Sequence, residues 1–266
     1  MSNEWLEVAR EALKLPALIT DFYGDLLKPG VKQVGTALAT IIGLGNTILW
    51  PIAVGNERAR IALERNLEKY RSQLETIPDE KIIAVQPEVG VPIAEKLSYV
   101  NDEELSSLYV NLLAKASTID TTKFAHPSFV NVINNLCPDE AVYLKELHKK
   151  GGAPFIEIRL CEKNSAKFSI FCLSTTIIPP VEVSFPDNEE AYLSNFEGLG
   201  LVKIRRDILS AVTGVYEDLE SKAKPQLDAM TIDKEKMEFR FERGKIEITP
   251  FGKLFMDACL TTLKQS

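Results

Sequence analysis

The chain of 266 residues has little of what catalytic and metal sites usually require. It contains only two histidines and four cysteines, and the cysteines, at positions 137, 161, 172 and 259, form no CxxC pair. A zinc site is therefore not expected, and scattered cysteines of this kind are typical of reduced thiols. We expect no enzyme activity, no metal and no cofactor. Acidic residues outnumber basic ones by 38 to 31, so any contact with nucleic acid must come from a local patch.

The remaining composition is that of a folded protein. Apolar residues make up 45% of the chain and charged residues 26%, which excludes wholesale disorder and a polytopic membrane protein. The first residues are acidic and amphipathic, unlike a secretory signal. Residues 3–28 have apolar side chains at helical spacing and predict an amphipathic helix that Pro16 divides.

One segment departs from this average, because residues 33–56 hold 24 consecutive positions without a formal charge. We call it the neutral segment. A helix of about 20 residues crosses a bilayer core, so the segment is long enough, although its mean hydropathy is borderline. Trp50 lies near its end, where an interfacial aromatic residue is expected, and Pro51 permits a kink or a helix end.

The small and polar residues of the neutral segment recur at helical spacing. One set shares a face that lets a second backbone approach closely, as helices do when they associate in lipid, and consists of Gly35, Ala39 and Gly43. A mildly polar stripe suits the lining of a wet lumen and consists of Gln33, Thr36, Thr40, Gly43 and Thr47. These patterns predict a helix that inserts and oligomerises.

A buried hairpin is the alternative for the same residues. One helix would end near Ile42, the glycines at 43 and 45 would form a turn, and a second short apolar run would follow. In that case the neutral segment is part of the core of a soluble protein. Basic residues on both sides of the segment favour a cytosolic C-terminal body only weakly.

After the neutral segment the pattern predicts helices first and strands later. Residues 57–74 form a charged helix with a thin apolar stripe, and residues 101–104 have the side chains of a helix start. From Ala153 the pattern alternates, and residues 237–242 and 245–248 predict a hairpin that turns at Arg243-Gly244. We therefore expect a mainly α chain with N-terminal helices and a membrane segment at 1–76, a helical body at 77–150 and a winged-helix-like α/β domain at 151–266.

Candidate ligand-binding residues are the basic side chains of this last domain, which would hold a short oligonucleotide by its backbone if the fold gathers them. They are Lys203, Arg205, Arg206, Arg240, Arg243 and Lys245. An ordinary solvated surface is the alternative. Duplex DNA is not expected as a partner, because the helix predicted at 187–198 carries four acidic residues and no basic one. His126 has the chemistry of a general base, but it precedes Pro127 at a predicted helix start, which favours a structural role.

Two groups of motifs resemble the bacterial Abi-alpha (abortive infection alpha) family. The first group has the pattern DE-L, NLLA, HPSF and PDEA, and its members lie at 102–105, 111–114, 126–129 and 138–141. The second has YLSNFEGLGL and TPFG-LF with a closing cysteine, at 192–201, 249–255 and 259. Cys137 stands where the family usually has serine, and Ile248 where it has leucine.

The resemblance implies a role in phage defence. It also implies that some members are membrane effectors paired with a nucleotidyltransferase, which would supply a nucleotide or oligonucleotide signal. The expected protein is an effector that oligomerises through its N-terminal helices in the bacterial inner membrane and disrupts it as a channel or pore, with membrane lipid and further copies of itself as partners. The alternative is a soluble interaction, adaptor or immunity protein with the neutral segment in its own core.

Overall fold

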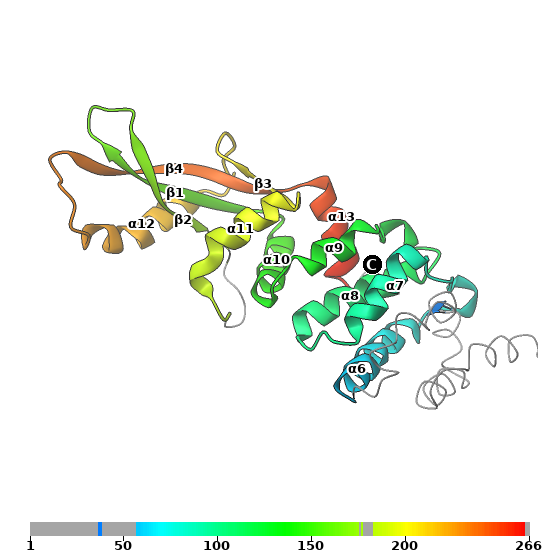
Figure 1. Cartoon of the computed structure of the whole chain (residues 1–266). Coiled ribbons are helices and arrows are strands. Elements are labelled where there is room, and N and C mark those ends of the chain that lie inside the picture. The colour runs from blue at the N-terminus through cyan, green and yellow to red at the C-terminus, as the bar shows by residue number, and fades with distance from the viewer. Residues whose placement is uncertain (1–36, 39–56, 176, 178–182, 264–266) are drawn as a thin grey trace, which may run out of the picture. The chain divides into compact units, whose positions relative to one another are not determined.

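A computed structural model describes residues 37–38, 57–175, 177 and 183–263 (Figure 1). Contacts divide the chain into two compact units. Unit 1 runs to Pro138 and resumes at Leu254, and unit 2 covers Asp139–Lys253. From residue 57 on, the α-helices of unit 1 are α6 (Glu57–Leu74), α7 (Pro87–Leu97), α8 (Glu103–Ala116) and α9 (Ser128–Asn134), together with the end of α13 (Pro250–Cys259).

Helix α8 is the centre of unit 1 and packs against α6, α7 and α9. It begins at an Asp102 cap, whose side chain accepts a hydrogen bond from the Leu105 N–H at 2.9 Å. The acids Glu103 and Glu104 in its first turn favour the positive end of the helix dipole. From Leu108 to Ala116 every residue is buried, so the helix start that the sequence predicts at 101–104 is confirmed.

Of the neutral segment, the structure describes Ala37 and Leu38 alone. Both are helical and buried, with 0% and 5% of their surfaces exposed. The Ala37 carbonyl accepts a hydrogen bond from the N–H of Val85 at 2.9 Å, and Val85 is fully buried. This part of the segment therefore contacts the loop that precedes α7. None of the helices that the structure describes is both long enough and apolar enough to cross a bilayer.

Unit 2 is an antiparallel sheet of four strands in the order β2-β1-β4-β3 with helices around it. In chain order its elements are α10 (Pro138–Lys150), β1 (Ala153–Glu162), β2 (Phe168–Thr175), α11 (Glu189–Gly198), β3 (Val202–Arg205), α12 (Val215–Asp228), β4 (Met237–Ile248) and the first turn of α13. The chain is thus mostly helical with a C-terminal α/β region.

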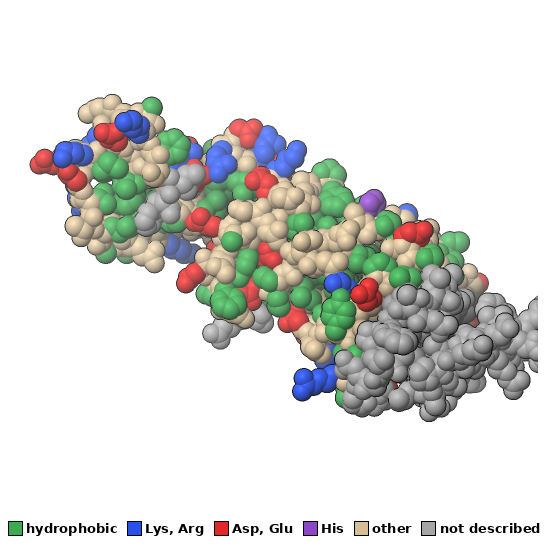
Figure 2. All heavy atoms as spheres, in the orientation of Figure 1, with side chains coloured by type: hydrophobic (Ala, Val, Ile, Leu, Met, Phe, Trp, Pro, Cys, Tyr) green, Lys and Arg blue, Asp and Glu red, His purple; other side chains and the backbone are tan. Residues whose placement is uncertain are grey.

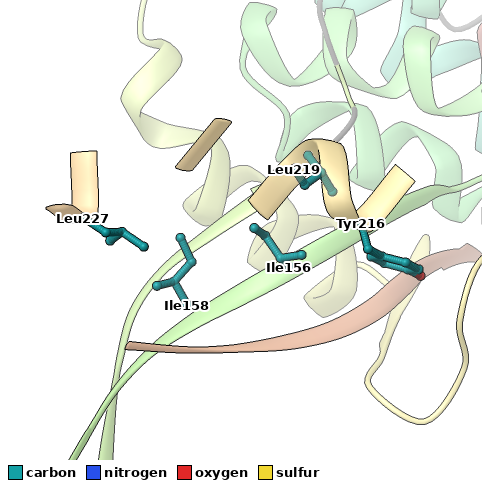
Figure 3. Packing of buried hydrophobic residues seen from close by; sticks show 5 residues of the cluster. All are labelled: Ile156, Ile158, Tyr216, Leu219 and Leu227. Atoms are coloured by element: carbon teal, nitrogen blue, oxygen red, sulfur yellow. The ribbon is translucent and has the colours of Figure 1, made fainter. Parts of the chain in front are cut away.

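One face of the sheet packs against α12. Strand β1 presents Ile156 and Ile158 on this face, as its alternation predicts, and they meet Tyr216, Leu219 and Leu227 of α12 (Figure 3). The half-buried side chains of Phe239 and Phe241 on β4 extend the same cluster. The opposite face of β1 carries Glu157 and Arg159.

The hairpin predicted at Arg243-Gly244 is wrong, because β4 is one continuous strand of 12 residues. Gly244 lies inside the strand, opposite Phe155. A Cβ at Gly244 would lie 2.4 Å from the Phe155 ring and 2.5 Å from the Arg205 carbonyl. The glycine is therefore required for close packing within the sheet, and no turn is made there.

Gly252, in the first turn of α13, has a similar role. A Cβ at this position would lie 1.9 Å from the carbonyl oxygen of Leu201, which precedes β3. The Thr249 N–H donates to the same carbonyl at 3.0 Å. The end of β4 and the start of α13 are thus held against residues 200–201 at a distance that only glycine allows.

We expect Gly252→Ala to destabilise the protein by roughly 1–3 kcal/mol, because the methyl group overlaps backbone that cannot move without breaking the Thr249 contact. Gly198→Ala is the matched control, since Gly198 is also helical and a Cβ added there would have no atom within 4 Å. Helix propensity alone should make that control neutral or more stable by about 0.5–1 kcal/mol. Chemical denaturation of both variants tests this, and equal stabilities would contradict it.

Candidate functional site

The acids at the start of α10 bind α11 and the residues ahead of it. The Asp139 carboxylate is buried and accepts hydrogen bonds from the N–H groups of Ser184 and Phe185 at 3.0 and 2.8 Å and from the Tyr192 hydroxyl at 3.1 Å. Burial would raise the pKa of Asp139, but these donors hold the pKa below its ordinary value. The carboxylate therefore fixes the chain ahead of α11.

Glu140 makes the second contact between the same two elements. Its carboxylate accepts a hydrogen bond from the side-chain amide of Asn195, 55 residues away in the sequence, at 2.7 Å, and Glu140 is also buried. The PDEA motif and the YLSNFEGLGL motif thus hold each other in unit 2. At these positions the residues of both motifs stabilise the fold.

The TPFG motif is bound to the end of the YLSNFEGLGL motif. The Thr249 hydroxyl donates to the Gly200 carbonyl at 2.6 Å and accepts from the Gly252 N–H at 2.8 Å, so it caps α13. Gly200 has φ +74°, in the left-handed region that favours glycine. This turn brings the Leu201 carbonyl to the place where Gly252 leaves room for it.

In unit 1 the NLL motif holds the end of α13. The Asn111 amide donates to the Cys259 carbonyl at 2.8 Å and its oxygen accepts from Gln73 at 2.7 Å. The Gln73 oxygen in turn accepts from the Leu263 N–H at 3.3 Å. This chain of amides joins α6, α8 and the residues after α13.

His126 lies at a helix start, as the sequence predicts. Its Nδ1 accepts from the Ser128 N–H at 3.2 Å and lies 2.6 Å from the Ser128 hydroxyl. Phe129 of the same motif packs edge-on against Phe255 of α13, with ring centroids 5.4 Å apart. Over the described part of the chain no group of three or more His, Cys, Asp or Glu side chains could hold a metal ion.

The four arginines among the basic candidates contact carboxylates. Arg206 donates to Glu157 at 2.6 Å, and Arg159 holds the other oxygen of that carboxylate at 2.7 Å. Burial would raise the pKa of Glu157, but the two guanidinium groups hold it below its ordinary value. Arg205 lies 2.7 Å from Asp207 and 3.3 Å from Glu247. Figure 2 accordingly shows blue and red side chains interspersed.

The sheet also separates these residues. Arg243 lies on the α12 face, where it contacts Glu217 and Glu220 at 3.0 and 2.7 Å. Arg240 lies on the opposite face and donates to Glu238 at 2.7 Å. Lys245 is the register partner of Arg205, and Lys203 that of Glu247. The structure therefore brings Lys203, Arg205 and Lys245 together at the ends of β3 and β4, whereas Arg206 and Arg240 contact carboxylates on the other face.

A hollow of about 660 Å³ lies beside Lys203. Its lining comes from the last turn of α10, the ends of β3 and β4 and the start of α13, and consists of His148, Gly151, Lys203, Glu247, Ile248, Thr249, Pro250 and Lys253. Lys203 and Lys253 are exposed in this lining, Pro250 and Lys253 belong to the first turn of α13, and Arg205 contacts Glu247 at 3.3 Å. Two exposed cations beside the start of a helix make the hollow a candidate site for a small anion. Sequence reasoning found Lys203 but missed His148 and Lys253, because no motif spacing relates them.

The predicted pore-lining and helix-packing residues lie outside the described residues. They are Gln33, Gly35, Thr36, Ala39, Thr40, Gly43 and Thr47. Their roles stay predictions from the sequence.

Comparison with known proteins identifies the family. A sequence model of the abortive infection alpha family matches residues 62–259, which is most of the chain. The protein belongs to the abortive infection alpha family. The resemblance that the motifs predict is confirmed, and the family description indicates an anti-phage role.

Two further comparisons add little. The structure of an uncharacterized protein from the hydrocarbon-degrading marine bacterium Alcanivorax borkumensis SK2 is similar at 19% identity and a TM-score of 0.33, over 55% of this chain and 99% of that one. No curated protein matches the chain.

We expect Asp139→Ala to lower the free energy of unfolding by about 1–3 kcal/mol, because it leaves the N–H groups of Ser184 and Phe185 without their acceptor. Tyr192→Phe, which removes one donor, should lower the free energy of unfolding by less, about 0.5–1.5 kcal/mol.

The lowered pKa of Asp139 in the folded state makes the stability depend on pH. The stabilisation by this carboxylate is present above the unfolded pKa of about 4 and is lost as the pH falls through the folded pKa. Denaturation curves between neutral and acid pH should therefore show a smaller acid loss in Asp139→Asn than in the wild type, and an unchanged loss would contradict this account.

Proposed function

We propose that this family member is an abortive-infection effector that acts on the bacterial inner membrane, with unit 2 on the cytoplasmic side. The observation that carries the proposal is the neutral segment, 24 residues without a formal charge in a chain where 26% of residues are charged. Its small-residue face supports association of copies in lipid, and its polar stripe supports a channel or pore.

A signal at unit 2 would gate this assembly. The hollow beside Lys203 and Lys253 supports an anionic ligand, and a nucleotide or short oligonucleotide from a partner nucleotidyltransferase fits that charge. The winged-helix likeness belongs to the same proposal, because β3 and β4 form the antiparallel pair of a wing with α12 inserted between them.

We expect Gly35→Leu and Gly43→Leu to reduce toxicity and to weaken self-association in the membrane, because bulky side chains separate the helices. Fractionation, dye leakage and membrane potential after phage infection measure the effect. Leu38→Ile is the conservative control from the same segment and should retain activity. A wild-type chain that stays in the cytosol and leaves the membrane potential intact would overturn the proposal.

For the signal we expect Lys203→Glu and Lys253→Glu each to weaken binding of an oligonucleotide about tenfold, since each removes one cation and adds one anion at the hollow. Lys222→Glu, an exposed residue on α12 away from the hollow, makes the same charge change and should leave affinity unchanged. Titration with labelled oligoadenylate measures these affinities. If Lys203→Glu, Lys253→Glu and Lys222→Glu all bind it with the same affinity, the hollow is not the binding site.

A soluble interaction protein is the second candidate, and a specific observation favours it. Ala37 and Leu38 are buried, and the Ala37 carbonyl is bound by Val85 of unit 1. If the whole neutral segment packs in this way, the chain purifies without detergent. Gly43→Leu then lowers the melting temperature and has no effect on membranes, which separates the two candidates in one experiment.

A further inference from the structure

Part of strand β4 has an open edge. Strand β1 pairs with β4 from Met237 to Ile246, whereas β3 pairs only with residues 245–248. On the β3 side, residues 237–243 therefore face no strand of the part of the chain that the structure describes. An edge of this kind is a template for another extended chain.

The sequence of this edge is complementary to itself when read in the opposite direction. Residues 235–243 read EKMEFRFER. In an antiparallel pair of copies centred on Phe239, Glu238 lies opposite Arg240 of the other copy and Met237 opposite Phe241. The pattern continues outward, with Lys236 opposite Glu242 and Glu235 opposite Arg243. Every charged residue meets the opposite sign and every apolar residue meets an apolar one.

The α12 face of the edge leaves room for a second copy. Helix α12 packs mainly over β1, and residues of α12 and of the first half of β4 line a hollow of about 660 Å³. The hollow has an apolar floor and a charged rim, and the floor consists of Leu227, Ile232, Met237, Phe239 and Phe241. Side chains of a second β4 would continue this half-buried layer.

The other face carries the charges. Arg240 is exposed and contacts Glu238 within its own chain, and Glu242 contacts Arg159 at 3.2 Å. A second copy would place another carboxylate beside each Arg240 and another cation beside each Glu238. Opposite charges directly across two antiparallel strands stabilise the pair, and like charges destabilise it.

From this complementarity we propose that two copies of the chain pair through their β4 edges, antiparallel and centred on Phe239, to form a continuous sheet of eight strands. The occupant of the edge is a second copy of this chain. The interface differs from the N-terminal association described above and stands independently of any action on membranes.

A cysteine scan of the full chain tests the register. Opposed side chains in an antiparallel pair have Cβ atoms about 4.5–5.5 Å apart, so Phe239→Cys should cross-link to its own copy with a short thiol reagent. Phe241→Cys is the matched control on the same face, because two copies of it would be roughly 13 Å apart. A mixture of Met237→Cys and Phe241→Cys chains should cross-link, although neither does so alone. The unsubstituted chain, with its four cysteines, is the blank.

Charge reversal tests the complementarity on the face that carries the charges, where Arg240 is exposed. In the Phe239→Cys chain, Arg240→Glu should lower the cross-linking yield about tenfold, because it places two like-charged pairs across the interface. Adding Glu238→Arg restores opposite signs and should restore the yield.

Equal cross-linking yields for Phe239→Cys and Phe241→Cys would overturn the pairing. The pairing would also be overturned if Arg240→Glu left the cross-linking yield unchanged, or if adding Glu238→Arg did not restore it. Fractionation of the same chains reports separately on the membrane proposal. A failure of either proposal is therefore distinguishable from a failure of the other.

Discussion

The Leu201 carbonyl is the contact on which unit 2 depends. It accepts the Thr249 N–H and occupies the space that Gly252 leaves by lacking a side chain. Because β3 begins at the next residue, this contact fixes the register of β3 against β4 and the point at which α13 begins. The same ends of β3 and β4 and the start of α13 line the hollow beside Lys203.

The family motifs are explained by the same kind of contact. Asp139 and Glu140 receive hydrogen bonds from residues at or ahead of α11, Asn111 binds the end of α13, and Thr249 binds Gly200. Each motif residue meets a residue of another motif or the backbone beside one. These motif residues therefore stabilise the fold.

Charge is mostly compensated inside unit 2. Arg205, Arg206 and Arg243 are bound to carboxylates of their own chain, two of which belong to α12. Lys203 and Lys253, which border the hollow of unit 2, have no such partner among the described contacts. The alternating charges of β4 lie along the open edge of that strand. An acidic protein can thus present a cationic site and a self-complementary edge without a basic surface overall.

The sequence by itself determined the features that depend on neighbours along the chain. The Asp102 cap and the alternation of β1 follow from residues close together in the sequence, so both could be predicted. The continuity of β4 could not, because Gly244 looks like a turn residue until the Phe155 ring is found against it. The pairing of Arg206 with Glu157, 49 residues away, and the meeting of His148, Lys203 and Lys253 were likewise decided by the tertiary structure alone, since contacts between distant segments leave no periodic pattern in a single sequence.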